Sequence, residues 1–220
     1  MTRVKICGVT TFADALAAAE AGADLLGFNF YRKSPRYLEP QAAARIADGL
    51  RAQLGAACPA LVGVFVNEPV SAISAALALA GVGFAQLSGD ESEALLRELR
   101  GIGYKAARAA AVAQALDDVQ YFSASFPADE RLPSLLLDAH HPQLYGGTGA
   151  QASDEIALAV RARVPRLMLA GGLTPENVAA RVQTVQPWGV DTASGVEAQG
   201  QPGVKDHAKV RAFIEAARGG

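Results

Sequence analysis

Two residues with side chains able to move a proton each lie at the end of a strand-like run. Cys7 belongs to the run at residues 4–8, and Asp138 directly follows three leucines. A carboxylate that ends an apolar run is costly to bury unless it is paired, and a pocket at a strand end is where its pKa could rise. One thiolate and one carboxyl in the same pocket would provide a base and an acid for proton transfer within one substrate, without a cofactor. Taken alone, Cys7 could equally be a packed core thiol, and Asp138 could cap the next loop.

Two later loops have the composition of a phosphate site. They contain Gly171 and Gly172, and then Ser194 and Gly195. Glycine lets a backbone approach a ligand closely, and the N–H groups of such loops, with those of a short helix expected to begin near Val196, could hold a phosphate dianion. Ordinary turns use glycine equally well, so this interpretation competes with a purely structural one.

Further polar residues follow other apolar runs. Arg36, just after a Ser-Pro pair, would suit a second anion such as a carboxylate, although surface arginines are common. Ser88 and Asp191 are possible substrate contacts. The three histidines, at 140, 141 and 207, show no metal-ligand spacing, so we expect no metal.

The elements that carry these residues repeat as a strand followed by a helix. The expected strands are nearly continuous apolar runs, as in parallel sheets covered on both faces. They span residues 4–8, 24–30, 61–67, 82–89, 103–109, 135–139, 166–172 and 188–195. Thr10 and Thr11 are the residues that could cap the first helix, and Thr174 with Pro175 is expected to begin the seventh.

Eight such units in 220 residues predict an α/β fold with a single (β/α)8 TIM barrel spanning residues 1–220. A doubly wound open sheet is the alternative, but no GxGxxG sequence opens the first helix. In a closed barrel the carboxyl ends of all strands meet on one rim. Cys7 and Asp138 would then face the same cavity.

Composition excludes several classes of protein. Half of the residues are apolar, and 20 basic against 22 acidic residues leave a net charge of −2 with no polybasic block. A disordered chain is therefore excluded, and neither nucleic acid nor a membrane is expected as a partner. Two cysteines make no disulfide framework, and no signal peptide or apolar span is evident, which predicts a cytoplasmic protein. The expected partner is a small phosphorylated molecule, and the chain could be a monomer or a homodimer.

Several motifs, in order along nearly the whole chain, resemble those of the phosphoribosylanthranilate isomerase family of tryptophan biosynthesis. They are KICG at 5–8, GFNFYRKSPR at 27–36, VGVFVN at 62–67, LLLDA followed by GGTG, LAGGLTPENV at 169–178 and VDTASGVE at 190–197. The resemblance implies a cofactor-free Amadori rearrangement of N-(5-phosphoribosyl)anthranilate to 1-(2-carboxyphenylamino)-1-deoxyribulose 5-phosphate.

The resemblance also implies roles for individual residues. Asp138 matches the family's acid and Cys7 its base, whereas Arg36 would hold the anthranilate carboxylate and the two glycine-containing loops the phosphate. Ser88 stands where the family usually has histidine. Asp191 would orient either a backbone loop or a substrate hydroxyl.

Three alternatives remain open. The histidine-pathway isomerase is similar but uses a carboxylate as base, which Cys7 disfavours. A phosphate-barrel lyase or epimerase would usually have metal ligands or a strand-end lysine, for which Lys105 is the candidate. A catalytically silent barrel would only bind a phosphorylated metabolite.

Overall fold

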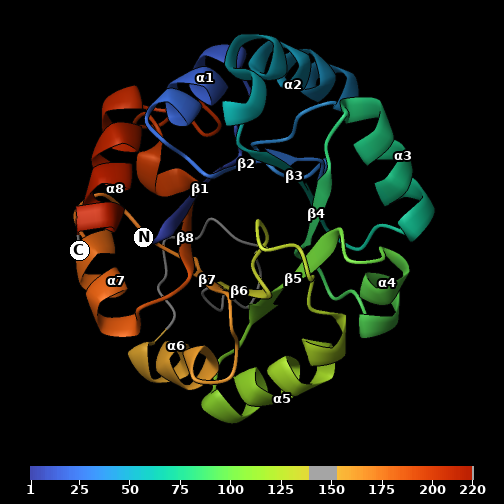
Figure 1. Cartoon of the computed structure of the whole chain (residues 1–220), viewed down its shortest axis with the longest axis vertical. Coiled ribbons are helices and arrows are strands. Elements are labelled where there is room, and N and C mark those ends of the chain that lie inside the picture. The colour runs from blue at the N-terminus through green and yellow to red at the C-terminus, as the bar shows by residue number, and fades with distance from the viewer. Residues whose placement is uncertain (139–152, 220) are drawn as a thin grey trace.

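The computed structural model describes residues 1–138 and 153–219. Its strands form a closed barrel in which neighbours pair in chain order (Figure 1). The strands are β1 (Arg3–Cys7), β2 (Leu25–Asn29), β3 (Ala60–Phe65), β4 (Phe84–Leu87), β5 (Gly103–Arg108), β6 (Leu135–Asp138), β7 (Leu167–Leu169) and β8 (Gly189–Thr192). The predicted glycine-rich loop at 145–149 and the histidines at 140 and 141 lie outside the described residues.

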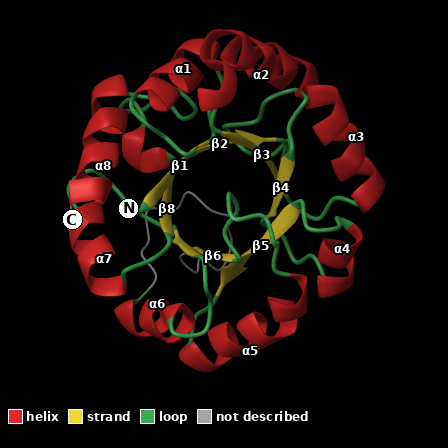
Figure 2. Ribbon diagram, viewed as in Figure 1, coloured by secondary structure: helices red, strands yellow, loops and turns green. Residues whose placement is uncertain are grey.

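A helix follows each strand and lies outside the barrel, as Figure 2 shows. The α-helices are α1 (Phe12–Glu20), α2 (Pro40–Leu54), α3 (Val70–Ala80), α4 (Glu93–Glu98), α5 (Val112–Phe122), α6 (Asp154–Arg161), α7 (Val178–Val185) and α8 (His207–Gly219). Single 3-10 turns are η1 (Gly55–Ala57), η2 (Ser123–Ser125) and η3 (Ser194–Val196). All strand pairs are parallel, and β1 pairs with β8 to close the sheet. The predicted barrel is confirmed, and the open sheet is excluded.

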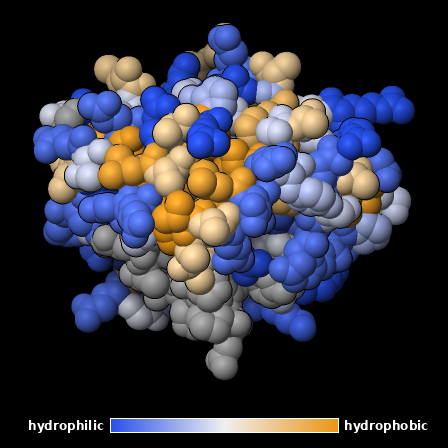
Figure 3. All heavy atoms as spheres, turned by 90° about the horizontal axis from the view of Figure 1, so that it is seen from below, coloured by the Kyte–Doolittle hydropathy of each residue, from blue (hydrophilic) through white to orange (hydrophobic). Residues whose placement is uncertain are grey.

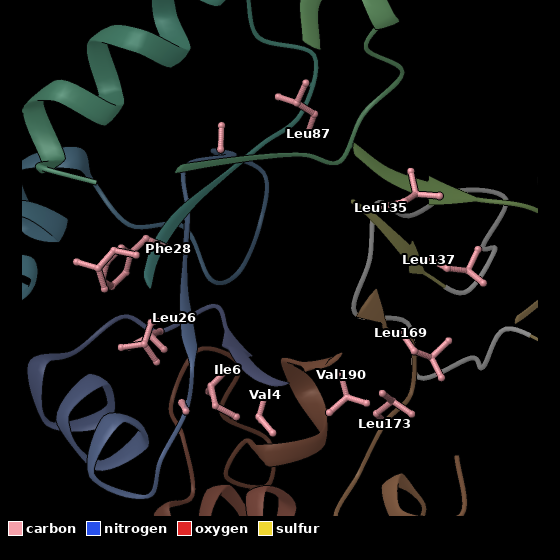
Figure 4. Close-up of a cluster of buried hydrophobic side chains, with 14 of the residues drawn as sticks. Val4, Ile6, Leu26, Phe28, Leu87, Leu135, Leu137, Leu169, Leu173 and Val190 are labelled. Atoms are coloured by element: carbon pink, nitrogen blue, oxygen red, sulfur yellow. The ribbon is translucent and has the colours of Figure 1, made fainter. Parts of the chain in front are cut away.

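Alternation along each strand decides which side chains reach the cavity. In β1, Val4 and Ile6 join the large apolar cluster between sheet and helices (Figure 4). Lys5 and Cys7, at the intervening positions, therefore face the barrel interior, because successive side chains of a strand point to opposite faces. A smaller apolar cluster fills that interior and includes Tyr104, Leu136 and Met168.

The first helix begins where the sequence predicts it, and the seventh does not. The Thr11 side chain accepts a hydrogen bond from the backbone N–H of Asp14, as expected for an N-cap. The predicted start of the seventh helix at Thr174 is wrong, because α7 begins after Asn177. The Asn177 side chain instead accepts from the Thr174 N–H and donates to the Gly172 carbonyl oxygen, so this segment forms a turn that supports the glycine-containing loop.

One face of the molecule combines polar and apolar side chains. Figure 3 views the molecule from the side of α5 and α6, where apolar side chains gather near the middle of a face that is otherwise largely polar. Leu158 of α6 is one exposed apolar residue of the described chain. Among the described residues, no helix has the length and apolar character needed to cross a membrane.

Candidate active site

The carboxyl ends of the strands surround one cavity. Of the nine candidate residues, eight line it: Cys7, Arg36, Ser88, Asp138, Gly171, Gly172, Asp191 and Ser194. Gly195 follows Ser194 and is not among the lining residues. Residues that lie up to 187 positions apart in the sequence thus meet because each lies at, or in the loop after, the carboxyl end of a strand of the same barrel.

Cys7 lies at the base of the cavity with only 9% of its surface exposed. Burial raises the pKa of its thiol, because a thiolate is poorly solvated in the interior. The positive charge of Lys5, which lies on the same face of β1, opposes this rise. The cysteine is therefore a buried thiol whose thiolate is favoured most by the charge of Lys5.

Lys5 and Asp191 form an ion pair inside the barrel. The lysine Nζ lies 3.0 Å from both carboxylate oxygens of Asp191, and its side chain is fully buried. Burial alone would lower the pKa of Lys5, but the charge of Asp191 raises it well above its usual range. Lys5 is thus a permanent cation beneath Cys7. The sequence places Lys5 two positions before Cys7 in the same expected strand, so both side chains should share a face. Lys5 was nevertheless not among the residues predicted for the site.

Asp138 lies across the cavity at the end of β6. Its strand partner in the β5–β6 register is Arg108, which also lines the cavity. Arg108 donates to the Gly89 carbonyl oxygen and pairs with Asp90, both at 3.4 Å. A carboxyl and a cation thus lie side by side on the rim opposite the thiol.

Arg36 is held by a partner from the other end of the chain. Its Nε and Nη2 donate to the two carboxylate oxygens of Glu197 at 2.7 and 2.8 Å. Glu197 also accepts from the Nζ of Lys205 at 3.1 Å and from the backbone N–H of Gly203. Gly8 permits this placement, because a Cβ there would lie 2.4 Å from the Arg36 Cδ. Glu197 and Lys205 were missed from the sequence, which gives no local signal for a contact across 161 residues.

The loops after β7 and β8, which contain the candidate glycines, form a further part of the cavity wall. Gly171 and Gly172 have φ angles of 88° and 57°, in the left-handed region that favours glycine. Gly195 lies against the loop after β7, where an added Cβ would meet the Leu173 carbonyl oxygen at 2.0 Å. The short helix expected near Val196 is the single turn η3, which begins two residues earlier, at Ser194.

A hydrogen-bonded chain crosses the barrel interior beneath Ser88. The Tyr104 hydroxyl donates to Gln86 Oε1 at 2.9 Å, and Gln86 Nε2 donates to the Ser88 hydroxyl at 3.0 Å. Burial raises the pKa of the Tyr104 phenol, so this group remains protonated. The Gln86 side chain therefore orients the hydroxyl of Ser88, which lines the cavity.

Lys105, the candidate for a lyase-type lysine, does not line the cavity. It occupies an outward position of β5 and pairs with Glu91 at 2.9 Å, with further bonds to the Leu87 and Gly89 carbonyl oxygens. It binds the segment after β4 to the barrel. Among the residues that the structure describes, no group of three histidine, cysteine or acidic side chains could hold a metal ion.

The comparisons with known proteins agree with this geometry. Residues 4–216 match the family model described as N-(5'phosphoribosyl)anthranilate (PRA) isomerase. The N-(5'-phosphoribosyl)anthranilate isomerase of Trichlorobacter lovleyi is 44% identical over 99% of this chain and 98% of its own length. That of Geobacter sulfurreducens is 42% identical over the full length of both chains.

Solved structures show the same similarity. The phosphoribosyl anthranilate isomerase of Thermotoga maritima has a TM-score of 0.84 at 36% identity, with both chains fully covered. A phosphoribosyl anthranilate isomerase in complex with reduced 1-(o-carboxyphenylamino)-1-deoxyribulose 5-phosphate has a TM-score of 0.81 at 35% identity, again over both whole chains. The family match, the identities and the shared barrel together establish that this chain belongs to the phosphoribosylanthranilate isomerase family.

Proposed function

We propose that this chain catalyses the Amadori rearrangement of N-(5-phosphoribosyl)anthranilate to 1-(2-carboxyphenylamino)-1-deoxyribulose 5-phosphate, the isomerase step of tryptophan biosynthesis. The observation that carries this proposal is the position of Cys7 and Asp138 on one cavity, with Arg36 also at its wall. A base, an acid and an anion-binding group are the parts that an internal proton transfer on an anionic sugar requires. Membership of the isomerase family supports the same reaction.

In the first step Asp138 would act as the general acid. Its proton goes to the ring oxygen of the sugar, the bond from that oxygen to C1 breaks, and the anilino nitrogen lone pair forms a C1=N double bond. The product is an open-chain protonated Schiff base with a new hydroxyl group. Arg108 beside Asp138 supplies a positive charge that favours the carboxylate left behind.

In the second step Cys7 would act as the base. Its thiolate takes the proton from C2, the C2–H electron pair becomes the C1=C2 bond, and the C=N electrons return to nitrogen. The resulting enolamine tautomerises to the ketone. The Schiff base acidifies C2–H, so a thiolate of moderate basicity suffices.

The charges around Arg36 suit a carboxylate. Arg36 and Lys205 contribute two positive charges and Glu197 one negative charge, which leaves one positive charge uncompensated within this cluster. The Nη1 of Arg36 makes no hydrogen bond to the described residues, and it would bind the anthranilate carboxylate. The glycine-containing loops of the cavity would hold the phosphate.

A fluorescence assay tests the proposal. Purified protein is added in metal-free buffer to phosphoribosylanthranilate generated in situ, and we expect rapid loss of its fluorescence with no release of free anthranilate beyond uncatalysed hydrolysis. Cys7→Ala and Asp138→Asn should each lower kcat by orders of magnitude with smaller effects on ground-state binding. Cys58→Ala, at the second cysteine, is the control and should retain turnover. Full turnover in both site variants would show that the residue roles are wrong.

Three further properties belong to the same proposal. The whole chain, residues 1–220, is taken as one barrel domain, because the barrel elements extend from β1 to α8. The two free thiols support a reducing compartment, the cytoplasm. A monomer or a homodimer remains the expected assembly, and a dimeric relative from Thermotoga maritima has been solved as generated monomers.

A further inference from the structure

We propose that Lys5 is a positioning residue for the reaction: its buried ammonium, held in place by Asp191, stabilises the thiolate of Cys7. This inference rests on the proposed function for its catalytic consequence. The effect on the thiol itself is independent of that function and can be measured without substrate.

Among the described residues, the Lys5 ammonium donates hydrogen bonds to Asp191, and Cys7 lies two positions further along the same face of β1. Both oxygens of Asp191 lie 3.0 Å from its Nζ, and none of the lysine side chain is exposed. A fully buried lysine destabilises the fold, because burial of any ion removes several kcal/mol of hydration free energy. An apolar residue could fill this interior position next to the apolar cluster at lower cost. A lysine two positions before the cysteine, on the same face, places a fixed cation under the thiol.

Other charged groups also act on the thiol, and they come from different elements. Asp191 of β8 disfavours the thiolate, whereas Lys205, from the segment between β8 and α8, favours it. Arg36, after β2, and the Tyr104 phenol of β5 also lie within electrostatic reach. Of these groups, Lys5 makes the largest favourable contribution to the thiolate, and Asp191 makes the largest charge-based contribution against it.

The opposite signs of Lys5 and Asp191 give the inference a sharp test. Loss of the lysine should raise the pKa of Cys7, and loss of the aspartate charge in the Lys5→Met background, where no buried lysine depends on that charge, should lower it again. A purely structural pair would behave differently, because disruption of the interior by either substitution would change the thiol in the same direction.

The experiment measures alkylation of Cys7 by iodoacetamide across a range of pH in a Cys58→Ser background, with the site of modification confirmed by mass spectrometry. Lys5→Met should lower the alkylation rate at neutral pH about tenfold or more, because a nearby opposite charge commonly shifts a titrating group by one pK unit or more. The double variant Lys5→Met/Asp191→Asn removes both charges and should give a rate between those of Lys5→Met and the parent.

Lys105→Met is the matched control. Lys105 is also a buried lysine paired with a carboxylate, Glu91, at 2.9 Å, but on the outer side of the barrel. This variant should lose comparable stability and keep the alkylation profile of the parent. If Lys5→Met does not fold, the double variant, which leaves no unpaired charge in the interior, should still be alkylated more slowly than the parent.

A second readout separates this inference from the proposed function. In Lys5→Met the pH profile of kcat should move in parallel with the alkylation midpoint, with a smaller change in KM. Alkylation that is unchanged in Lys5→Met, or that is no faster in the double variant than in Lys5→Met, would overturn the inference. Shifts of opposite sign in a protein without isomerase activity would instead leave the effect on the thiol standing and refute the function.

Discussion

Replacement of Glu197 by glutamine tests how strongly the Arg36 cluster depends on one anion. The substitution keeps the size of the side chain but leaves Arg36 and Lys205 with no counter-ion. The Glu197 side chain is 7% exposed, that of Arg36 13%, and that of Lys205 is fully buried. Loss of one partner of a buried ion pair costs about 3–5 kcal/mol, and we expect about 3 kcal/mol because Arg36 borders the open cavity.

The effect should depend on pH with a defined sign. Burial alone would raise the pKa of Glu197, but the hydrogen bond from Arg36 and the charge of Lys205 outweigh it and lower the pKa. A carboxylate with a lowered pKa stabilises the fold above its unfolded pKa, about 4.3, and this contribution is lost as pH falls through the folded value. The stability difference between parent and Glu197→Gln should be largest near neutral pH and should shrink in acid.

Urea unfolding at neutral pH and near pH 4 gives both quantities. The control is Glu39→Gln, which breaks an ion pair with Arg32 at 3.5 Å where both side chains are more than half exposed. Such surface pairs contribute about 0–1 kcal/mol. Equal losses for Glu197→Gln and Glu39→Gln, or a loss that does not change with pH, would refute the reasoning.

Two further substitutions test the packing around the cavity. In Gly195→Ala the new methyl group would overlap the Leu173 carbonyl oxygen, so the loop must move. The KM should therefore rise about tenfold or more, and an unchanged KM would exclude Gly195 from the phosphate site. Tyr104→Phe leaves Gln86 Oε1 without its buried donor. Urea unfolding should show that the free energy of unfolding falls by about 1–3 kcal/mol. Unchanged stability would mean that another donor replaces the phenol.

The sequence predicted the barrel because its strands carry a strong local signal. Each expected strand overlaps an observed one, since a parallel strand covered on both faces needs an apolar run whatever its neighbours are. The ends were less accurate. The expected strand at 166–172 is reduced to Leu167–Leu169, because the alanine and glycines that follow belong to the cavity wall.

The residues of the candidate site that mark a strand end were predictable from the sequence. Cys7 and Asp138 both do so, and the alternation of the strands then places both toward the cavity. Glu197 could not be found in this way, because its contact with Arg36 depends on the tertiary fold rather than on local pattern. The displaced start of α7 has a similar cause: Asn177 uses its side chain to satisfy the turn, which overrides the Thr-Pro signal.

The pairing of β1 with β8 has a consequence for how the protein is made. The Lys5–Asp191 contact joins residues 186 positions apart, so the surroundings of Cys7 are incomplete until β8 has left the ribosome. At about 5–20 residues per second, roughly 10–40 s of synthesis separate the two partners. Throughout that interval the nascent chain carries an incompletely shielded thiol and an unpaired lysine on a strand whose β8-facing edge is open. Early chaperone protection of the amino-terminal strand would therefore matter more for this topology than for one with local strand pairs.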